Sequence, residues 1–85
     1  MTGHEQPSPL TRRLIDDCYP AVLPGVEVGP EQDFFELGGD SLQLIRLVSV
    51  VQETFGVEID AVRFFENPTA LCLTDEIRVR LPADQ

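Results

Sequence analysis

The sequence predicts an all-α fold: a four-helix bundle with a short third helix and a long loop between the first two helices. Apolar residues recur three and four positions apart, the period of an amphipathic helix, and no stretch shows convincing strand alternation. Prolines and glycines gather between residues 23 and 39, where they favour an irregular connection. The 85 residues suit one small domain, placed at 8–82, with a disordered lead-in at 1–7 and a tail at 83–85.

The first helix is expected to begin after Ser8. Serine is a favoured N-cap, and the following Pro9 suits the first helical position, where the missing N–H is not needed. Pro20 removes a backbone donor and clashes with the preceding turn, so it should kink or end this helix. The apolar residues at helical spacing are Leu10, Leu14, Ile15, Cys18 and Val22.

The connection over residues 23–39 is long for a small domain, and such loops are usually functional or flexible. Phe34, Phe35 and Leu37 argue against flexibility, because apolar side chains are stabilised by leaving water. We expect at least one phenylalanine to enter the core and hold the loop in place.

The second helix, residues 41–55, has the strongest pattern. Asp40 is a suitable N-cap, and Gln43 three positions later completes a variant of the capping box. Gly56 is placed to end the helix in a left-handed conformation. The core stripe consists of Leu44, Leu47, Val48, Val51 and Phe55.

Two shorter helices complete the predicted bundle. Asp60 can cap a third helix that runs through Glu66 and stops before Pro68. A fourth helix is expected from Thr69, with arginines near its end that complement the helix dipole. The third helix carries Val62, Phe64 and Phe65, and the fourth faces inward through Ala70, Leu73, Ile77 and Leu81.

Ser41 stands at the start of the second helix, directly after Gly38, Gly39 and Asp40. Free backbone N–H groups in the first turn of a helix favour a negative group, so a phosphate esterified to Ser41 would be well placed. The two glycines carry no side chain, which would let a partner's backbone approach the hydroxyl. An ordinary loop followed by an N-cap explains the same residues, so this pattern alone does not establish a function.

Leu42 is an apolar residue that points away from the predicted core. At about 100° per residue, Leu42 lies about 160° and Ile45 about 100° from the direction of Leu44. An outward leucine beside Ser41 favours a docking contact, although isolated surface leucines are also common.

The charge balance indicates the kind of partner. Fifteen acids and six bases give a net charge of −9, which excludes nucleic-acid binding as the main function. Seven acids and no base lie between Arg13 and Arg46, and this run either steers a basic partner toward Ser41 or forms a solvated surface. All six bases are arginines, so a Schiff-base lysine and a Walker-type phosphate loop are excluded.

The cellular location is predicted from the lack of membrane-spanning and secretory segments in the sequence. No apolar run is long enough to span a membrane, and the first residues do not form a secretory signal. Cys18 and Cys72 fit no metal-site spacing and are too few for a disulfide scaffold, so burial in the core is expected. We therefore expect a cytoplasmic monomer with no membrane contact.

Residues 33–42, Asp-Phe-Phe-Glu-Leu-Gly-Gly-Asp-Ser-Leu, resemble the phosphopantetheine attachment motif of peptidyl carrier (thiolation) proteins of nonribosomal peptide synthesis. Residues 55–59 (Phe-Gly-Val-Glu-Ile) and 64–69 (Phe-Phe-Glu-Asn-Pro-Thr) agree, and the resemblance extends over residues 10–81. Fatty-acid and polyketide acyl carriers share the Asp-Ser-Leu core, but the double glycine after Phe-Phe-Glu-Leu is more similar to the peptidyl branch. The resemblance implies an acyl-carrier-protein-like bundle.

The resemblance also implies a function. A phosphopantetheinyl transferase would join 4′-phosphopantetheine from coenzyme A to Ser41, and the thiol of that group would hold an aminoacyl or acyl thioester. An adenylation enzyme would load this thiol, condensation or tailoring enzymes would use it, and the protein itself would be a non-catalytic carrier, interpreted as free-standing (type II). The flanking motif is Gly38, Gly39, Asp40 and Leu42. The implied partner surface is Leu42, Ile45, Arg46, Val62, Arg63 and Phe64.

Three other interpretations compete with the peptidyl carrier. A polyketide-type acyl carrier shares the motif core, and an unmodified helical adaptor would bind partners through the outward Leu42 and its neighbours. Residues 39–42, Gly-Asp-Ser-Leu, also match the signature of a lipase and esterase family, which needs a downstream histidine as general base. The single histidine is His4, upstream of Ser41, so the hydrolase is the least favoured of the three.

Overall fold

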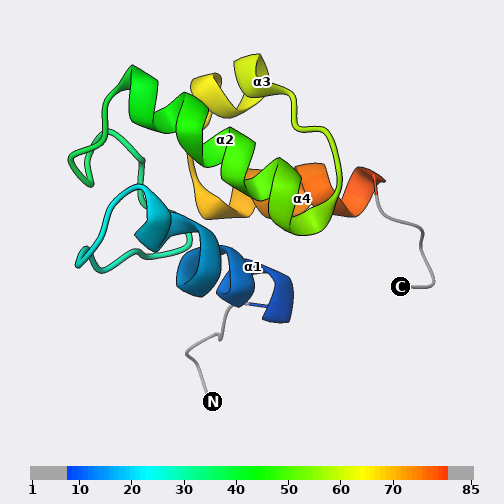
Figure 1. Ribbon diagram of the computed structural model, residues 1–85, viewed down its shortest axis with the longest axis horizontal. Helices are drawn as coiled ribbons and strands as arrows, with labels where there is room; N and C mark the ends of the chain where they lie inside the picture. Colours follow the sequence, from blue (N-terminus) through cyan, green and yellow to red (C-terminus); the bar gives the residue numbers. More distant parts are fainter. Residues whose placement is uncertain (1–7, 81–85) are drawn as a thin grey trace.

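Four α-helices form the fold in the computed structural model, which describes residues 8–80 (Figure 1). They are α1 (Pro9–Arg13), α2 (Ser41–Phe55), α3 (Ala61–Glu66) and α4 (Ala70–Arg80), and residues 8–80 contain no strand. This confirms the predicted all-α bundle with a short third helix and a long loop between the first two. The predicted lead-in at 1–7, the tail at 83–85 and the inward Leu81 lie outside the described residues.

The first helical segment changes its winding along its length. Ser8 Oγ accepts a hydrogen bond from the N–H of Thr11 at 3.2 Å, and Pro9 occupies the first turn, as the sequence predicts. After α1 the chain continues through a π-helical turn, Leu14–Cys18, and a 3-10 turn, Tyr19–Ala21. Pro20 lies in this last turn, where its ring excludes a further α-helical turn, so the helix ends there as expected. The π-helical turn is not predicted by the sequence.

Both Cys18 and Tyr19 are fully buried at the end of the π-helical turn. Consecutive residues of an α-helix point about 100° apart, so a change of winding alters which of them face the core. The Tyr19 N–H donates to the carbonyl of Leu14, five residues back, which is the widened spacing of a π-helix. The altered winding therefore accompanies an aromatic ring added to the core beside a cysteine.

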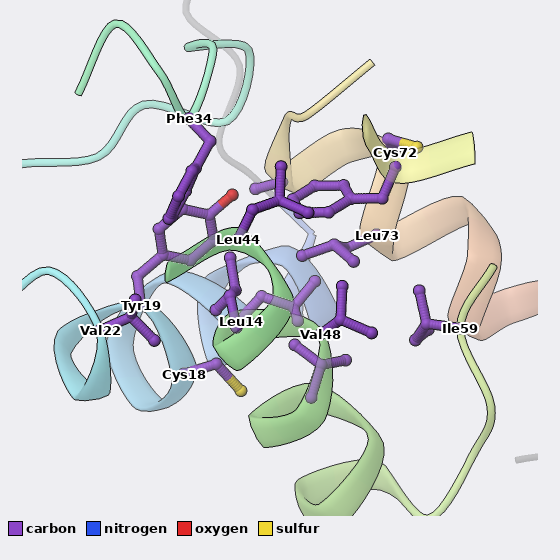
Figure 2. Close-up of a cluster of buried hydrophobic side chains, with 14 of the residues drawn as sticks. Leu14, Cys18, Tyr19, Val22, Phe34, Leu44, Val48, Ile59, Cys72 and Leu73 are labelled. Carbon is purple, nitrogen blue, oxygen red and sulfur yellow. The ribbon is translucent and has the colours of Figure 1, made fainter. Parts of the chain in front are cut away.

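The core lies where α2 packs on the π-helical turn and α1 packs on α4 (Figures 1 and 2). Four members of the predicted stripe on α2 are buried, whereas Phe55 at its end is only half-buried. Cys18 and Cys72 are free thiols within this core. Its largest fully buried side chains are Leu14, Tyr19, Phe34, Leu44, Leu47, Val51, Phe64, Leu73 and Ile77.

A chain of hydroxyl groups joins α1 to α4. The Thr74 hydroxyl donates to the carbonyl of Ala70 at 2.9 Å, which leaves the Thr11 hydroxyl to donate to Thr74 Oγ1 at 2.6 Å. Ser8 Oγ lies 3.1 Å from Thr11 Oγ1 and completes the chain. Because Thr11 and Thr74 are buried, these bonds satisfy polar groups that water does not reach.

The long loop is attached to the core at Phe34, which confirms the prediction that at least one of its phenylalanines is buried. The Phe34 ring is fully buried beside Tyr19, with ring centroids 6.2 Å apart, and Figure 2 shows the two side chains converging. The Phe34 N–H donates to the carbonyl of Pro68 at 2.8 Å, and the Leu71 N–H donates to the carbonyl of Pro30 at 3.1 Å. The loop is thus hydrogen-bonded to the junction of α3 and α4.

The remaining helix ends follow the predicted chemistry. Gly56 ends α2 with φ of 69°, in the left-handed region, and Asp60 accepts from the Arg63 N–H at the start of α3. Helix α4 begins at Ala70, one residue later than predicted, because Thr69 acts as a cap: its hydroxyl accepts from the Cys72 N–H at 3.2 Å. Across residues 8–80, no helix is both long and apolar enough to cross a membrane.

Candidate functional site

The segment before α2 folds into a tight turn around the carbonyl of Phe34. That oxygen accepts hydrogen bonds from the N–H groups of Leu37 at 3.2 Å and Gly39 at 3.1 Å. Asp33 Oδ1 accepts from the Phe35 N–H at 2.7 Å and starts the turn. Because the Phe34 side chain is buried, the turn fixes the start of α2 relative to the core.

Ser41 is the exposed first residue of α2. Asp40 Oδ1 accepts from the Gln43 N–H at 2.9 Å and Gln43 Oε1 accepts from the Asp40 N–H at 3.0 Å, which confirms the capping box. Gln43 Nε2 also donates to the carbonyl of Val22 at 3.4 Å. The N–H groups of Ser41 and Leu42 have no acceptor among residues 8–80, as expected for the first helical positions.

The two glycines before Asp40 have different roles. A methyl group added to Gly39 would lie 2.6 Å from Cδ2 of Phe34, so this glycine makes room for the buried ring. Gly38 has φ of 100°, a conformation that favours glycine, and a methyl group there would meet no atom within 4 Å. The sequence assigned both positions to close approach by a partner, but only Gly38 leaves the surface open.

Acidic residues are numerous in the part of the sequence that leads to Ser41. Asp16 and Asp17 pair with Arg12 and Arg13 at 3.4 Å each, so two of the seven acids in the run are compensated. None of the remaining acids has an ion pair with another residue of the part that the structure describes. They are Glu27, Glu31, Asp33, Glu36 and Asp40.

Exposed apolar side chains follow Ser41 on α2 and also lie on α3, which packs on α2. Leu42 is 75% exposed, so the prediction that it points outward is confirmed. Ile45 and Val62 are also exposed large apolar residues. Arg46 is exposed on α2 and has no ion pair within residues 8–80.

The structure corrects the predicted surface at Phe64. This side chain is 0% exposed and belongs to the core, so the prediction that Phe64 contributes to a partner surface is wrong. Val62 and Phe65 are three positions apart and share one face of α3, whereas Phe64 lies about 200° from Val62. Phe65 is 52% exposed and takes the outward position. The three-residue spacing of Val62 and Phe65 is visible in the sequence and could have identified Phe65 as the outward phenylalanine.

Two further features were not found from the sequence. The Phe65 ring meets Phe35 of the loop edge-on, with centroids 5.7 Å apart, and both rings are partly exposed. Arg63, predicted on the surface, is exposed but pairs through Nε with Glu76 Oε2 at 3.3 Å. The burial of Glu76 had one sequence signal: it lies three residues after Leu73 and next to Ile77, both inward-facing.

These residues fit a phosphate ester at Ser41. The residue is exposed, and the adjoining N–H groups in the first turn of α2 favour a negative phosphate. Gly38 leaves one side of the site open, and the Asp40 carboxylate is engaged by the Gln43 N–H. Ser41, with the Leu42 N–H beside it, is the part of the chain that would hold such a group.

Comparison with known proteins agrees with this site. The family described as "Phosphopantetheine attachment site" matches residues 21–77. Pyochelin synthetase PchE of Pseudomonas aeruginosa is 34% identical over 76 residues, covering 89% of this chain but 5% of that protein. One of the linear gramicidin synthase proteins of Brevibacillus parabrevis is 39% identical over 67 residues, covering 79% of this chain and 1% of that protein. The chain thus spans a small part of these relatives.

The fold is also found in a solved structure. A chain in the structure of the phosphopantetheine transferase Sfp in complex with coenzyme A and a peptidyl carrier protein superposes with a TM-score of 0.79. The match covers 88% of this chain and 96% of that one at 23% identity. The match over residues 21–77 and the synthetase relatives together show that the chain belongs to the phosphopantetheine attachment family and is a carrier domain similar to those of nonribosomal peptide synthetases.

Proposed function

We propose that Ser41 is the attachment residue for 4′-phosphopantetheine in this domain. The observation that carries the proposal is the exposed position of Ser41 at the capped start of α2, inside the family match. When attached, the group supplies a terminal thiol that holds an aminoacyl or acyl unit as a thioester. The residues around it fix the start of α2, leave the N–H groups of Ser41 and Leu42 open to the phosphate, and keep the serine accessible.

The domain acts as a non-catalytic carrier in this proposal. Its enzymes are a phosphopantetheinyl transferase, an adenylation enzyme, and condensation or tailoring enzymes. Support comes from the exposed face on α2 and α3 and from the synthetase relatives. The carboxylate next to Ser41 also supports a non-catalytic role, because Asp40 is already engaged in capping α2. The domain boundaries 8–82, the monomeric state, the free-standing form and the cytoplasmic location stay predictions.

A Ser41→Ala variant tests the attachment residue. We expect it to fold as the parent does, because the residue is exposed, and to gain no mass when incubated with coenzyme A and a phosphopantetheinyl transferase. Ser49→Ala is the matched control, since Ser49 is an exposed serine two turns further along α2. Intact-protein mass spectrometry should show one phosphopantetheinyl addition in the parent and in the control.

The possible outcomes distinguish the peptidyl carrier from the three alternative functions. Labelling of Ser41→Ala would refute the site, and an unlabelled parent would favour an unmodified adaptor. Loading of the converted protein with a malonyl-type unit, and not with an amino acid, would favour the polyketide-type carrier. Turnover of a chromogenic ester that requires Ser41 would revive the hydrolase.

Leu42→Asp tests the exposed face. Because Leu42 is 75% exposed, the change should alter the free energy of unfolding by no more than about 0.5 kcal/mol while weakening transfer from the loading enzyme. Val79→Asp is the matched control, since Val79 is 77% exposed on α4. Urea denaturation and loading kinetics check the two parts. A large loss of stability, or an equal effect of both variants on loading, would contradict the assignment.

A further inference from the structure

Glu76 of α4 is a buried carboxylate with two arginine partners. Its side chain is 5% exposed. Oε2 lies 3.3 Å from Nε of Arg63 on α3, and Oε1 lies 2.8 Å from Nη1 of Arg80 on α4. A buried charge is tolerated when its oxygens are paired, so both contacts are needed to satisfy this group.

The two arginines differ in what they connect. Arg80 is four residues from Glu76, and its Nη1 also donates to the Glu76 carbonyl at 3.2 Å, so this contact stays within α4. Arg63 comes from a different helix, and its side chain is 69% exposed. The Arg63–Glu76 pair is therefore an ionic connection between α3 and the core-facing side of α4.

Helix α3 has few other attachments, one of which is the edge-on contact of Phe65 with Phe35 of the loop. It is six residues long and packs beside α2, and Phe64 is its only fully buried side chain (Figure 1). So short a helix has little stability of its own and depends on tertiary contacts for its placement. Val62 and Phe65 are the exposed large apolar residues of α3.

We propose that Glu76 positions α3 through Arg63 and thereby sets the orientation of Val62 and Phe65 toward the adenylation enzyme that loads the domain. Arg63 then acts through an internal ion pair, as a positioning residue, and its exposed guanidinium edge is not the main contact to the partner. The proposal rests on the proposed carrier function, because it assigns the face that partners use.

The test compares Glu76→Gln and Arg63→Gln in the full chain. Asp16→Asn is the control, because Asp16 also pairs with an arginine four residues away but is exposed and lies in the first helical segment. The first measurement is amide hydrogen exchange before attachment. It is read at Phe64, whose N–H donates to the Asp60 carbonyl at the start of α3, and at Asn67, whose N–H donates to the Arg63 carbonyl at its end. The second is the KM and kcat of the loading enzyme with each converted variant.

Both Gln variants should speed exchange of the α3 amides by about five-fold or more, with little change in α2. Each should raise KM with little change in kcat, and the double variant should be no worse than the more affected single variant. Unchanged α3 exchange in Glu76→Gln, or a raised KM in Arg63→Gln alone, would overturn the proposal and make Arg63 a direct contact.

A second variant and a mass measurement complete the test. If Glu76→Gln does not fold, Glu76→Met removes the charge with an apolar side chain of similar size, and its α3 exchange is read in the same way. Mass spectrometry of each variant reports attachment at Ser41. A parent that is never converted would contradict the carrier function itself, whereas normal conversion with unchanged α3 exchange would contradict this inference alone.

Discussion

Tyr19 shows how one residue can be well packed and still incompletely satisfied. Its ring is fully buried and lies beside Phe34, but its hydroxyl has no hydrogen-bond partner in the described part of the chain. Burying a hydroxyl without a partner costs about 1–3 kcal/mol. The aromatic ring therefore contributes to the core while its oxygen opposes folding.

Tyr19→Phe keeps the ring and removes this oxygen. We expect the free energy of unfolding to rise by about 1 kcal/mol, because the phenylalanine ring fills the same space without a buried polar group. Urea denaturation at neutral pH measures the change. Leu73→Ala, which empties part of the same core, should lower stability by about 2–5 kcal/mol and shows that the assay responds in both directions. A less stable Tyr19→Phe would mean that the hydroxyl has a partner.

Gly39 marks the limit of what a single residue type predicts. The sequence shows a glycine pair before Asp40 but does not show which neighbour needs the space. The Phe34 ring lies against Gly39, and this contact depends on where the loop enters the core. Ser41 and Leu42 could be predicted as exposed because their surroundings are set by the periodicity of one helix.

At the scale of one element, the start of α2 combines stability and function. The capping box at Asp40 defines where the helix begins and holds Ser41 in its first turn. Gln43 adds a hydrogen bond to Val22 at the end of the first helical segment. The same side chains that stabilise α2 therefore determine where the Ser41 hydroxyl lies.

Asp40→Ala should lower the free energy of unfolding by about 1 kcal/mol, because the Gln43 N–H loses its acceptor. Asp40→Asn is the matched control: it removes the same charge but keeps an N-cap oxygen, so stability should stay close to that of the parent. Thermal or urea unfolding of the three proteins gives the comparison. Equal losses in both variants would assign the effect to the charge and not to the cap.

Helices α2 and α3 differ in how well the sequence predicts them. The buried stripe of α2 repeats over fifteen residues, so its inner face is determined by spacing alone. Helix α3 has six residues, and its inner face depends on which phenylalanine fits the core. The π-helical turn Leu14–Cys18 was also missed, because its winding accompanies tertiary packing that no local pattern specifies.

For the whole molecule, the buried titratable groups predict how stability depends on pH. Burial raises the pKa of Tyr19 well above its ordinary value. Burial also raises the pKa values of the Cys18 and Cys72 thiols above 9.0, with smaller effects from neighbouring charges. In each case the folded protein holds its proton more tightly than the unfolded chain does. The resulting stability is fully present below pH 9.0 and is lost as pH rises.

We therefore expect the free energy of unfolding to fall progressively above about pH 9. Tyr19→Phe should show a shallower decline above about pH 10, where the unfolded tyrosine ionises. Circular dichroism of urea unfolding at several pH values between neutral and strongly alkaline checks both statements. A parent and variant with parallel declines above pH 10 would show that Tyr19 does not contribute.

The long loop has two parts with different attachment to the rest of the chain. Residues 30–39 are held by the burial of Phe34 and by the hydrogen bonds to Pro68 and Leu71. Gly25, in contrast, is exposed, and a methyl group there would meet no atom within 4 Å. Inserted sequences are best tolerated where backbone is neither buried nor bonded. The Pro24–Gly25 corner is therefore a place to graft a reporter peptide or to open a circular permutant, leaving the serine-bearing turn undisturbed.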